Sequence, residues 1–252
     1  MKVRGVCQNG QSVSDARRSF SLHLQGLPVG RSCTKNTTIE PLLAALMQAN
    51  TPKNIVLLGD SIFDNASYVK AGAAVIEHLE AMLPTQWRAV LLAVDGATAR
   101  QVASQVRSIP SDATHLFLSV GGNDALSHGQ MLDAPVRSSA DTWRLLAKII
   151  SEFGFDYREA VTACLRKNLP LTVCTIYNGN FPDVDYQLRA SVALQVFNDS
   201  IARIAREKGC DLLELRAVCT TPAHYANPIE PSETGGRQIA RAILEMLEGS
   251  KA

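Results

Sequence analysis

Three short motifs in this chain contain the residue types that nucleophilic catalysis uses. Gly59-Asp60-Ser61 offers a serine hydroxyl, and Gly121-Gly122-Asn123-Asp124 offers a side-chain amide. Between them lies Gly96, whose backbone N–H no side chain covers. A hydroxyl that attacks a carbonyl, together with N–H donors that hold the oxyanion, makes an acyl-transfer site. Each of these residue types is also common in turns and helix caps, so the motifs matter only if the fold brings them together.

Buried strands alternate with helices along most of the chain. Apolar runs with β-branched members predict strands covered on both faces, and helical spacing predicts the helices between them. The expected strands are 54–59, 87–94, 114–120, 171–177 and 211–215, and the expected helices are 66–83, 97–109, 139–168 with a break near Gly154, 186–209 with Gly209 as C-cap, and 235–249. This alternation predicts an α/β fold: a single three-layer α/β/α domain around a mostly parallel five-stranded sheet.

Each of the first three predicted strands ends directly before one of the motifs. The carboxyl ends of parallel strands meet at one edge of a sheet, and ligands bind in the crevice outside that edge. The sequence therefore predicts that the three motifs share one site.

In their order and position, the motifs resemble the first three blocks of the SGNH (GDSL) hydrolases, over about residues 53–248. The resemblance implies the flavodoxin-like fold of that family. It also implies a serine hydrolase that acts on small carboxylic esters, as an esterase, thioesterase or O-acetyl esterase. It implies Ser61 as the nucleophile, and an oxyanion hole made by the N–H groups of Ser61 and Gly96 and the amide of Asn123.

The C-terminal block departs from this family. Members usually carry Asp-x-x-His before the last helix, where this chain has Asn227 and Glu230. In one hypothesis Glu230 is the base, with its pKa raised by burial and with a hydrogen bond from the Asn227 amide. In a second, His224 or His128 supplies the base and Glu230 orients it. In a third, the site has lost hydrolysis and binds an acyl or glycosyl ligand.

Composition and charge exclude several other classes of protein. The 252 residues carry a formal net charge of +1, and only 6% are aromatic, so no basic or base-stacking surface for nucleic acid is expected. Neither G-x-G-x-x-G nor a P-loop follows the first strand, which argues against a dinucleotide enzyme. No metal or organic cofactor is indicated. Nothing in the sequence signals an oligomeric state.

The absence of certain patterns predicts the cellular location and the state of the N-terminal segment. No run of 18 apolar residues predicts a transmembrane helix, and the six cysteines form no CxxC pair, so a cytoplasmic location is the default expectation. Residues 1–37 lack periodic apolar residues and are expected to be a poorly ordered extension, with a short helix over 38–50 opening a hydrolase-like domain of residues 38–252. No Met-rich or aromatic run marks an apolar tunnel, so the sequence does not favour long-chain lipids.

Overall fold

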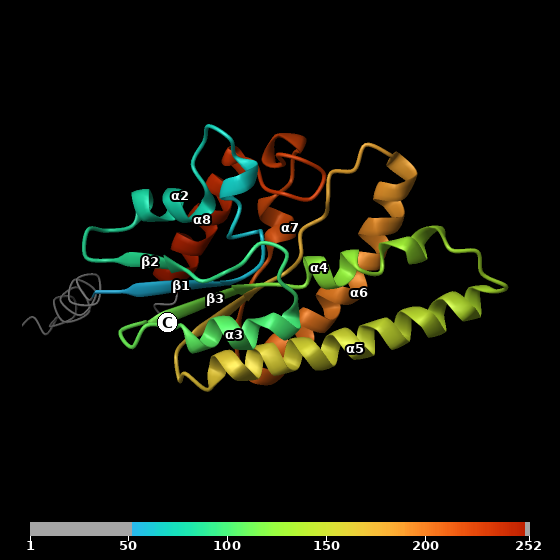
Figure 1. Ribbon diagram of the computed structural model, residues 1–252, viewed down its shortest axis with the longest axis horizontal. Coiled ribbons are helices and arrows are strands. Elements are labelled where there is room, and N and C mark those ends of the chain that lie inside the picture. Colours follow the sequence, from blue (N-terminus) through green and yellow to red (C-terminus); the bar gives the residue numbers. More distant parts are fainter. Residues whose placement is uncertain (1–51, 250–252) are drawn as a thin grey trace, which may run out of the picture. The chain divides into compact units, whose positions relative to one another are not determined.

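The computed structural model describes residues 52–249, and five of its strands form one parallel sheet (Figure 1). The strands are β1 Asn54–Gly59, β2 Arg88–Leu91, β3 His115–Ser119, β4 Leu171–Cys174 and β5 Asp211–Leu213. They lie in the order β2-β1-β3-β4-β5, and every neighbouring pair is parallel. The predicted α/β class with a parallel five-stranded sheet is confirmed. The predicted extension 1–37 and helix 38–50 lie outside the described residues.

Helices cover both faces of the sheet. The helices are α2 Val75–Met82, α3 Val102–Arg107, α4 Gly122–Leu126, α5 Ser139–Leu165, α6 Val184–Lys208, α7 Leu215–Val218 and α8 Glu233–Gly249, with 3-10 turns η2 Ala66–Tyr68, η3 Ala99–Gln101, η4 Gly129–Asp133 and η5 Pro222–His224. Helices α2 and α8 pack on one face, and α3, α5 and α6 pack on the other (Figure 1). Within residues 52–249, no helix is both long and apolar enough to cross a membrane.

Strand β1 shows why two helical layers are needed. Ile55 and Leu57 pack on the side of α2 and α8, whereas Val56 and Leu58 pack on the side of α3, α5 and α6. All four side chains are fully buried. Burying each one stabilises the fold by roughly 1.5–3 kcal/mol, so the strand is held firmly from both sides. The core therefore fixes the position of the end of β1, where the next loop begins.

Helix α5 corrects one prediction. It runs unbroken from Ser139 to Leu165, although the sequence predicted a break near Gly154. Phe153 and Tyr157 lie four residues apart on either side of this glycine, and both rings are buried in the core. Glycine inside a helix costs about 1 kcal/mol. Burying two aromatic rings outweighs that cost, so the helix continues.

The stretch 66–83 corrects another prediction, because it is not one helix. It forms η2, a turn and then the shorter α2. Gly72 donates its N–H to Val69 O (2.6 Å), which closes the turn. Asn65 Oδ1 accepts a hydrogen bond from Val75 N (2.9 Å) and so fixes where α2 begins. The predicted C-cap Gly209 is confirmed, with a left-handed φ of 68°.

Candidate active site

Ser61 lies in a tight turn directly after β1. Phe63 N and Asp64 N both donate to Asp60 O (3.2 and 3.1 Å), and Asp60 N donates to Ser119 O at the end of β3 (2.9 Å). Ser61 is only 7% exposed, and it lines a cavity at the carboxyl edge of the sheet. The turn therefore holds the serine hydroxyl at the place where ligands bind in such folds.

The glycine of this motif has a packing role. Gly59 has a φ of 124°, a conformation that side chains disfavour. A Cβ on Gly59 would lie 1.7 Å from Ser119 O. Only glycine lets β1 and β3 approach this closely just before the serine.

Gly96 forms the tip of the turn that follows β2. Ala97 N donates to Val94 O (3.0 Å), and Gly96 has a left-handed φ of 77°. No heavy atom lies within 4 Å of the position its Cβ would take, so the glycine is required by conformation and not by crowding. Among the hydrogen bonds of residues 52–249, none uses the N–H of Gly96 or of Ser61. Both N–H groups therefore lack an internal partner; Ser61 lines the cavity, whereas Gly96 is exposed and is not part of its wall.

Asn123 and Asp124, in the first turn of α4, fasten this helix to the turn after β2 and to η3. Asn123 Nδ2 donates to Ala97 O (3.0 Å), and Asp124 accepts a hydrogen bond from Ala99 N (3.1 Å). The amide of Asn123 carries two N–H groups, so one remains for a ligand. The two predicted oxyanion donors, Gly96 and Asn123, thus belong to segments that hold one another.

Glu230 is held by a compact loop before α8. Asn227 Oδ1 accepts hydrogen bonds from Ile229 N and Glu230 N (2.9 Å each). Tyr177 donates its hydroxyl proton to Ile229 O (2.6 Å), and Asn65 Nδ2 donates to Pro231 O (3.3 Å). Asn65 ends the turn that contains Ser61. The serine and the glutamate are therefore positioned by connected segments.

Asn227 has a different contact from the one that the sequence suggested. Its side-chain oxygen holds the backbone N–H of Glu230, and no hydrogen bond from its amide to the Glu230 carboxylate occurs among the described residues. The reason is an Asx turn: a short side-chain carbonyl caps the backbone two and three residues further on. Asn227 positions the glutamate through the main chain.

The Glu230 carboxyl is buried beside the serine. It is 4% exposed, it lines the same cavity as Ser61, and its Oε2 has no hydrogen-bond partner in the described part of the chain. Burial raises its pKa from 4.5 to about 7, the interaction with the Ser61 side chain acts in the opposite direction, and the charge of Asp95 raises the pKa further. At neutral pH the carboxyl is therefore close to half ionised.

Asp60 is a second buried carboxyl in this cavity. Its pKa is raised to about 8, chiefly by burial and also by the charges of Glu230 and Asp124. Its Oδ1 accepts a hydrogen bond from Ile62 N (3.2 Å). Asp60 is mostly protonated at neutral pH, so it supports the turn without adding a full negative charge beside Glu230.

The two candidate histidines lie in different places. His128 is exposed, directly precedes η4 and lines the cavity. His224, in η5, is not part of the cavity wall, and its Nδ1 accepts a hydrogen bond from Thr220 N (3.1 Å). Only His128 shares the cavity with the serine. Within residues 52–249, no group of His, Cys, Asp and Glu is arranged to hold a metal ion.

The cavity beside Ser61 is largely apolar, which the sequence did not lead us to expect. Its volume is about 110 Å³, which is space for several water molecules. Its apolar lining includes Met131, Leu132, Leu146, Ile149, Ile176, Phe181, Leu194 and Phe197. These residues come from η4, α5, the segment after β4 and α6. No single run of sequence contains them, which is why no apolar tunnel was evident from the sequence.

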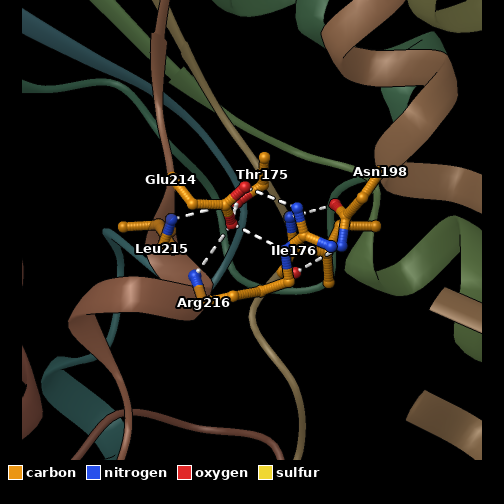
Figure 2. Close-up of polar contacts among 6 residues, drawn as sticks. All are labelled: Thr175, Ile176, Asn198, Glu214, Leu215 and Arg216. Atoms are coloured by element: carbon orange, nitrogen blue, oxygen red, sulfur yellow. Dashed lines mark hydrogen bonds and ion pairs between the residues drawn. The ribbon is translucent and has the colours of Figure 1, made fainter. Parts of the chain in front are cut away.

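A polar cluster fixes the segment after β4 that forms one wall of this cavity (Figure 2). Thr175 Oγ1 donates to Glu214 Oε1 (2.6 Å) and accepts a hydrogen bond from Leu215 N (2.9 Å). Asn198 of α6 bonds both backbone groups of Ile176, accepting from its N–H (2.7 Å) and donating to its carbonyl (2.8 Å). Ile176 is thereby set in the cavity wall.

Comparisons with known proteins bear on the family and the fold of this chain. Residues 57–237 match the sequence profile of the GDSL-like lipase/acylhydrolase family. No curated protein is similar enough in sequence to count as a match.

Several solved structures share the fold. An extracellular lipase from Streptomyces rimosus superimposes with a TM-score of 0.58 at 14% identity, covering 77% of this chain and 99% of that one. A lipolytic protein of the G-D-S-L family from Veillonella parvula gives 0.59 at 18% identity, covering 79% and 100%. The acetyl xylan esterase AlAXEase gives 0.55 at 16% identity, covering 77% and 99%. At these identities the likeness establishes the fold. Because the family profile spans most of its length, this chain belongs to the GDSL-like lipase/acylhydrolase family, a family of ester hydrolases.

Proposed function

We propose that this protein is a serine esterase, acting on carboxylic esters or thioesters, in which Ser61 is the nucleophile and Glu230 the general base. The observation that carries the proposal is the burial of Glu230 in the cavity that Ser61 lines, with a pKa raised to about 7. A carboxylate with an ordinary pKa near 4.3 is a weak base at neutral pH. One with a pKa near the working pH both accepts and returns a proton efficiently.

The proposed reaction has two halves. Glu230 takes the proton from Ser61 Oγ while that oxygen attacks the ester carbonyl, and the tetrahedral intermediate forms. The protonated Glu230 then gives its proton to the leaving alcohol or thiol as the bond to the carbonyl carbon breaks. In the second half, Glu230 takes a proton from water, the hydroxide attacks the acyl-enzyme, and Ser61 leaves with the proton while the free acid is released.

Three donors support charge stabilisation in both intermediates. The free N–H groups of Ser61 and Gly96 and the second N–H of Asn123 belong to segments that are tied together, so they need little reorganisation during reaction. Each such donor is typically worth about 2.7–4 kcal/mol in the transition state. The proposal therefore uses one residue from each of the first three motifs: Ser61, Gly96 and Asn123.

The alternatives receive less support from the geometry. His224 does not line the cavity, and His128 lines it from an exposed position. An enzyme that used His128 would still leave the buried Oε2 of Glu230 without a partner. A buried carboxylate oxygen with no partner is costly, and such costs are typical of functional groups. A protein that only binds a ligand would gain nothing from burying an unpartnered carboxylate oxygen of Glu230 beside Ser61.

The proposal is tested with 4-nitrophenyl butyrate and two serine variants. We expect the wild type to hydrolyse the ester, Ser61→Ala to be inactive, and Ser67→Ala to match the wild type, because Ser67 is exposed in η2. All three should have the same melting temperature within error. Wild-type turnover by Ser61→Ala overturns the assignment of the nucleophile. If the wild type hydrolyses no ester or thioester in a broad panel, the chain is a binding protein on this fold.

A further inference from the structure

We propose that the cavity beside Ser61 is an acyl-binding pocket, and that esters of medium-length or longer acyl chains, not acetyl esters, are the substrates. This inference rests on the proposed function, because it takes Ser61 as the atom at which the acyl group is transferred. It goes further because it states that the cavity binds the acyl part of the ester.

Polar and apolar groups of the cavity come from different parts of the fold. Its reactive groups, Ser61, Asn123 and Glu230, come from the loops at the carboxyl edge of the sheet. The walls that α5 and α6 contribute are apolar apart from Tyr186: Leu146, Ile149, Ala190, Ala193, Leu194 and Phe197. An ester carbonyl placed at Ser61 thus has apolar helix surfaces beside it. These surfaces offer hydrocarbon contacts and few hydrogen-bond partners, which suits an acyl chain and not a sugar.

The wall formed by η4 is fastened in place. Arg189 of α6 donates to Leu132 O (2.6 Å) and forms an ion pair with Asp133, and both of these partners belong to η4. Phe181 and Tyr186 stack edge to face, with ring centroids 4.8 Å apart, and both line the cavity. The contacts of Arg189 hold η4 against α6, and the ring contact holds the segment after β4 against α6, so these parts form sides of a preformed pocket. A preformed apolar pocket loses less free energy on binding than one that must assemble around its ligand.

The extent of the apolar lining decides between acetyl and longer acyl groups. An acetyl group would contact only the part of the wall nearest Ser61 and would leave most of the apolar residues of η4, α5 and α6 without a contact. Burying one methylene group contributes about 0.8 kcal/mol, which is roughly a fourfold effect on an equilibrium or rate constant. We therefore expect kcat/KM to rise by roughly fourfold with each added methylene until the pocket is filled.

The test begins with a series of 4-nitrophenyl esters from acetate through butyrate and hexanoate to decanoate, each below its critical micelle concentration. In the wild type, kcat/KM for hexanoate is expected to exceed that for acetate by roughly 200-fold, from four added methylenes. A flat or falling series, with Ser61-dependent hydrolysis of acetate, overturns the inference and leaves the proposed function standing.

Two neighbouring residues on α6 give a matched pair of variants. Ala193 lines the cavity, whereas Val192 is 52% exposed and is not part of the cavity wall. Ala193→Phe should fill the pocket and lower the ratio of kcat/KM for hexanoate to that for acetate by tenfold or more. Val192→Phe should keep the wild-type ratio. Equal ratios in the two variants contradict the pocket assignment. Melting temperatures confirm that both variants are folded.

Binding of decanoic acid supplies a readout that needs no turnover. By isothermal titration, the wild type and Ser61→Ala are expected to bind decanoate, and Ala193→Phe is expected to bind it at least tenfold more weakly. Failure of the proposed function would appear as binding without hydrolysis. Failure of this inference appears as no binding of decanoate, or as equal binding by Ala193→Phe.

Discussion

Replacing Glu230 by glutamine is expected to remove activity and, at neutral pH, to stabilise the fold. Glutamine has nearly the same shape, but its amide takes no proton from Ser61. Loss of a general base typically lowers the rate by 10²–10⁴-fold, so we expect kcat to fall by at least about a hundredfold. The gain in stability has a separate cause, which is the burial of the carboxylate.

The size of that gain follows from the pKa. The pKa of Glu230 is raised from 4.5 to about 7 because the charged form is buried. Each pH unit between these values corresponds to about 1.4 kcal/mol, so keeping the carboxyl ionised in the folded protein costs about 3 kcal/mol. The folded state binds this proton more tightly than the unfolded state does. The free energy of unfolding of the wild type therefore falls as pH rises from 4.5 to 7 and levels off above that range.

Urea denaturation at a series of pH values measures this effect. The quantity to plot is the free energy of unfolding of Glu230→Gln minus that of the wild type, because effects that do not depend on pH cancel in its slope. This difference should increase by about 3 kcal/mol between pH 4.5 and pH 7.5. Glu233→Gln is the matched control, because Glu233 is an exposed carboxylate three residues away, paired with Arg237 (2.9 Å).

Two results would refute the reasoning. A difference that stays constant with pH would show that the Glu230 carboxyl is not held in a buried, proton-retaining state. Wild-type turnover by Glu230→Gln would show that the base lies elsewhere, and inactivity of His128→Asn in the same assay would identify it.

The pH profile of the wild type distinguishes a glutamate base from a histidine base only when it is measured at several temperatures. Activity requires ionised Glu230, so kcat/KM should fall tenfold per pH unit below about 7 and be level above it. An ordinary histidine, with a pKa near 6.5, would give a similar curve. Temperature separates the two, because the ionisation enthalpy of a carboxyl is close to zero and that of an imidazolium is large. The pH at the midpoint of the kcat/KM profile is expected to stay nearly constant between 10 and 40 °C. A steep decrease of this midpoint pH on warming would favour a histidine as the base.

Two further variants test the oxyanion hole and the cavity wall. Asn123→Ala should lower kcat about a hundredfold or more, with a smaller change in KM, as measured on 4-nitrophenyl hexanoate; a loss below tenfold would remove Asn123 from the oxyanion hole. Thr175→Val should lower the free energy of unfolding by about 1–3 kcal/mol in urea, because Leu215 N loses its buried acceptor; an unchanged stability would show that the cluster in Figure 2 does not hold the wall.

The sheet was predictable because its strands are buried on both faces. Runs such as 54–59 contain almost only apolar residues, and a run of that kind has few stable alternatives to a central parallel strand. The helices were harder to predict where packing competes with local preference. Gly154 is an unfavourable residue in a helix, and only the burial of Phe153 and Tyr157 explains why α5 continues through it.

The candidate site was predictable in its motifs and less so in its environment. Ser61, Gly96 and Asn123 each follow a strand of the same sheet, so parallel topology alone brings them to one edge. The burial of Glu230 depends on Tyr177 and Asn65, which are far away in the sequence. The apolar cavity likewise combines residues of several separate segments. Contacts between distant segments leave no local pattern, so burial of Glu230 stayed one hypothesis among three and the apolar cavity was not predicted.

Labelling with a fluorophosphonate tests the central claim, an activated Ser61 whose base is Glu230, most directly. The reagent bonds covalently to a serine hydroxyl only when a neighbouring base activates it. Peptide mass spectrometry is expected to find the label on Ser61 in the wild type, and Glu230→Gln should be labelled at least about a hundredfold more slowly. His128→Asn should be labelled at the wild-type rate. An unlabelled wild type, a label on another residue, or equal rates for the wild type and Glu230→Gln would contradict the account.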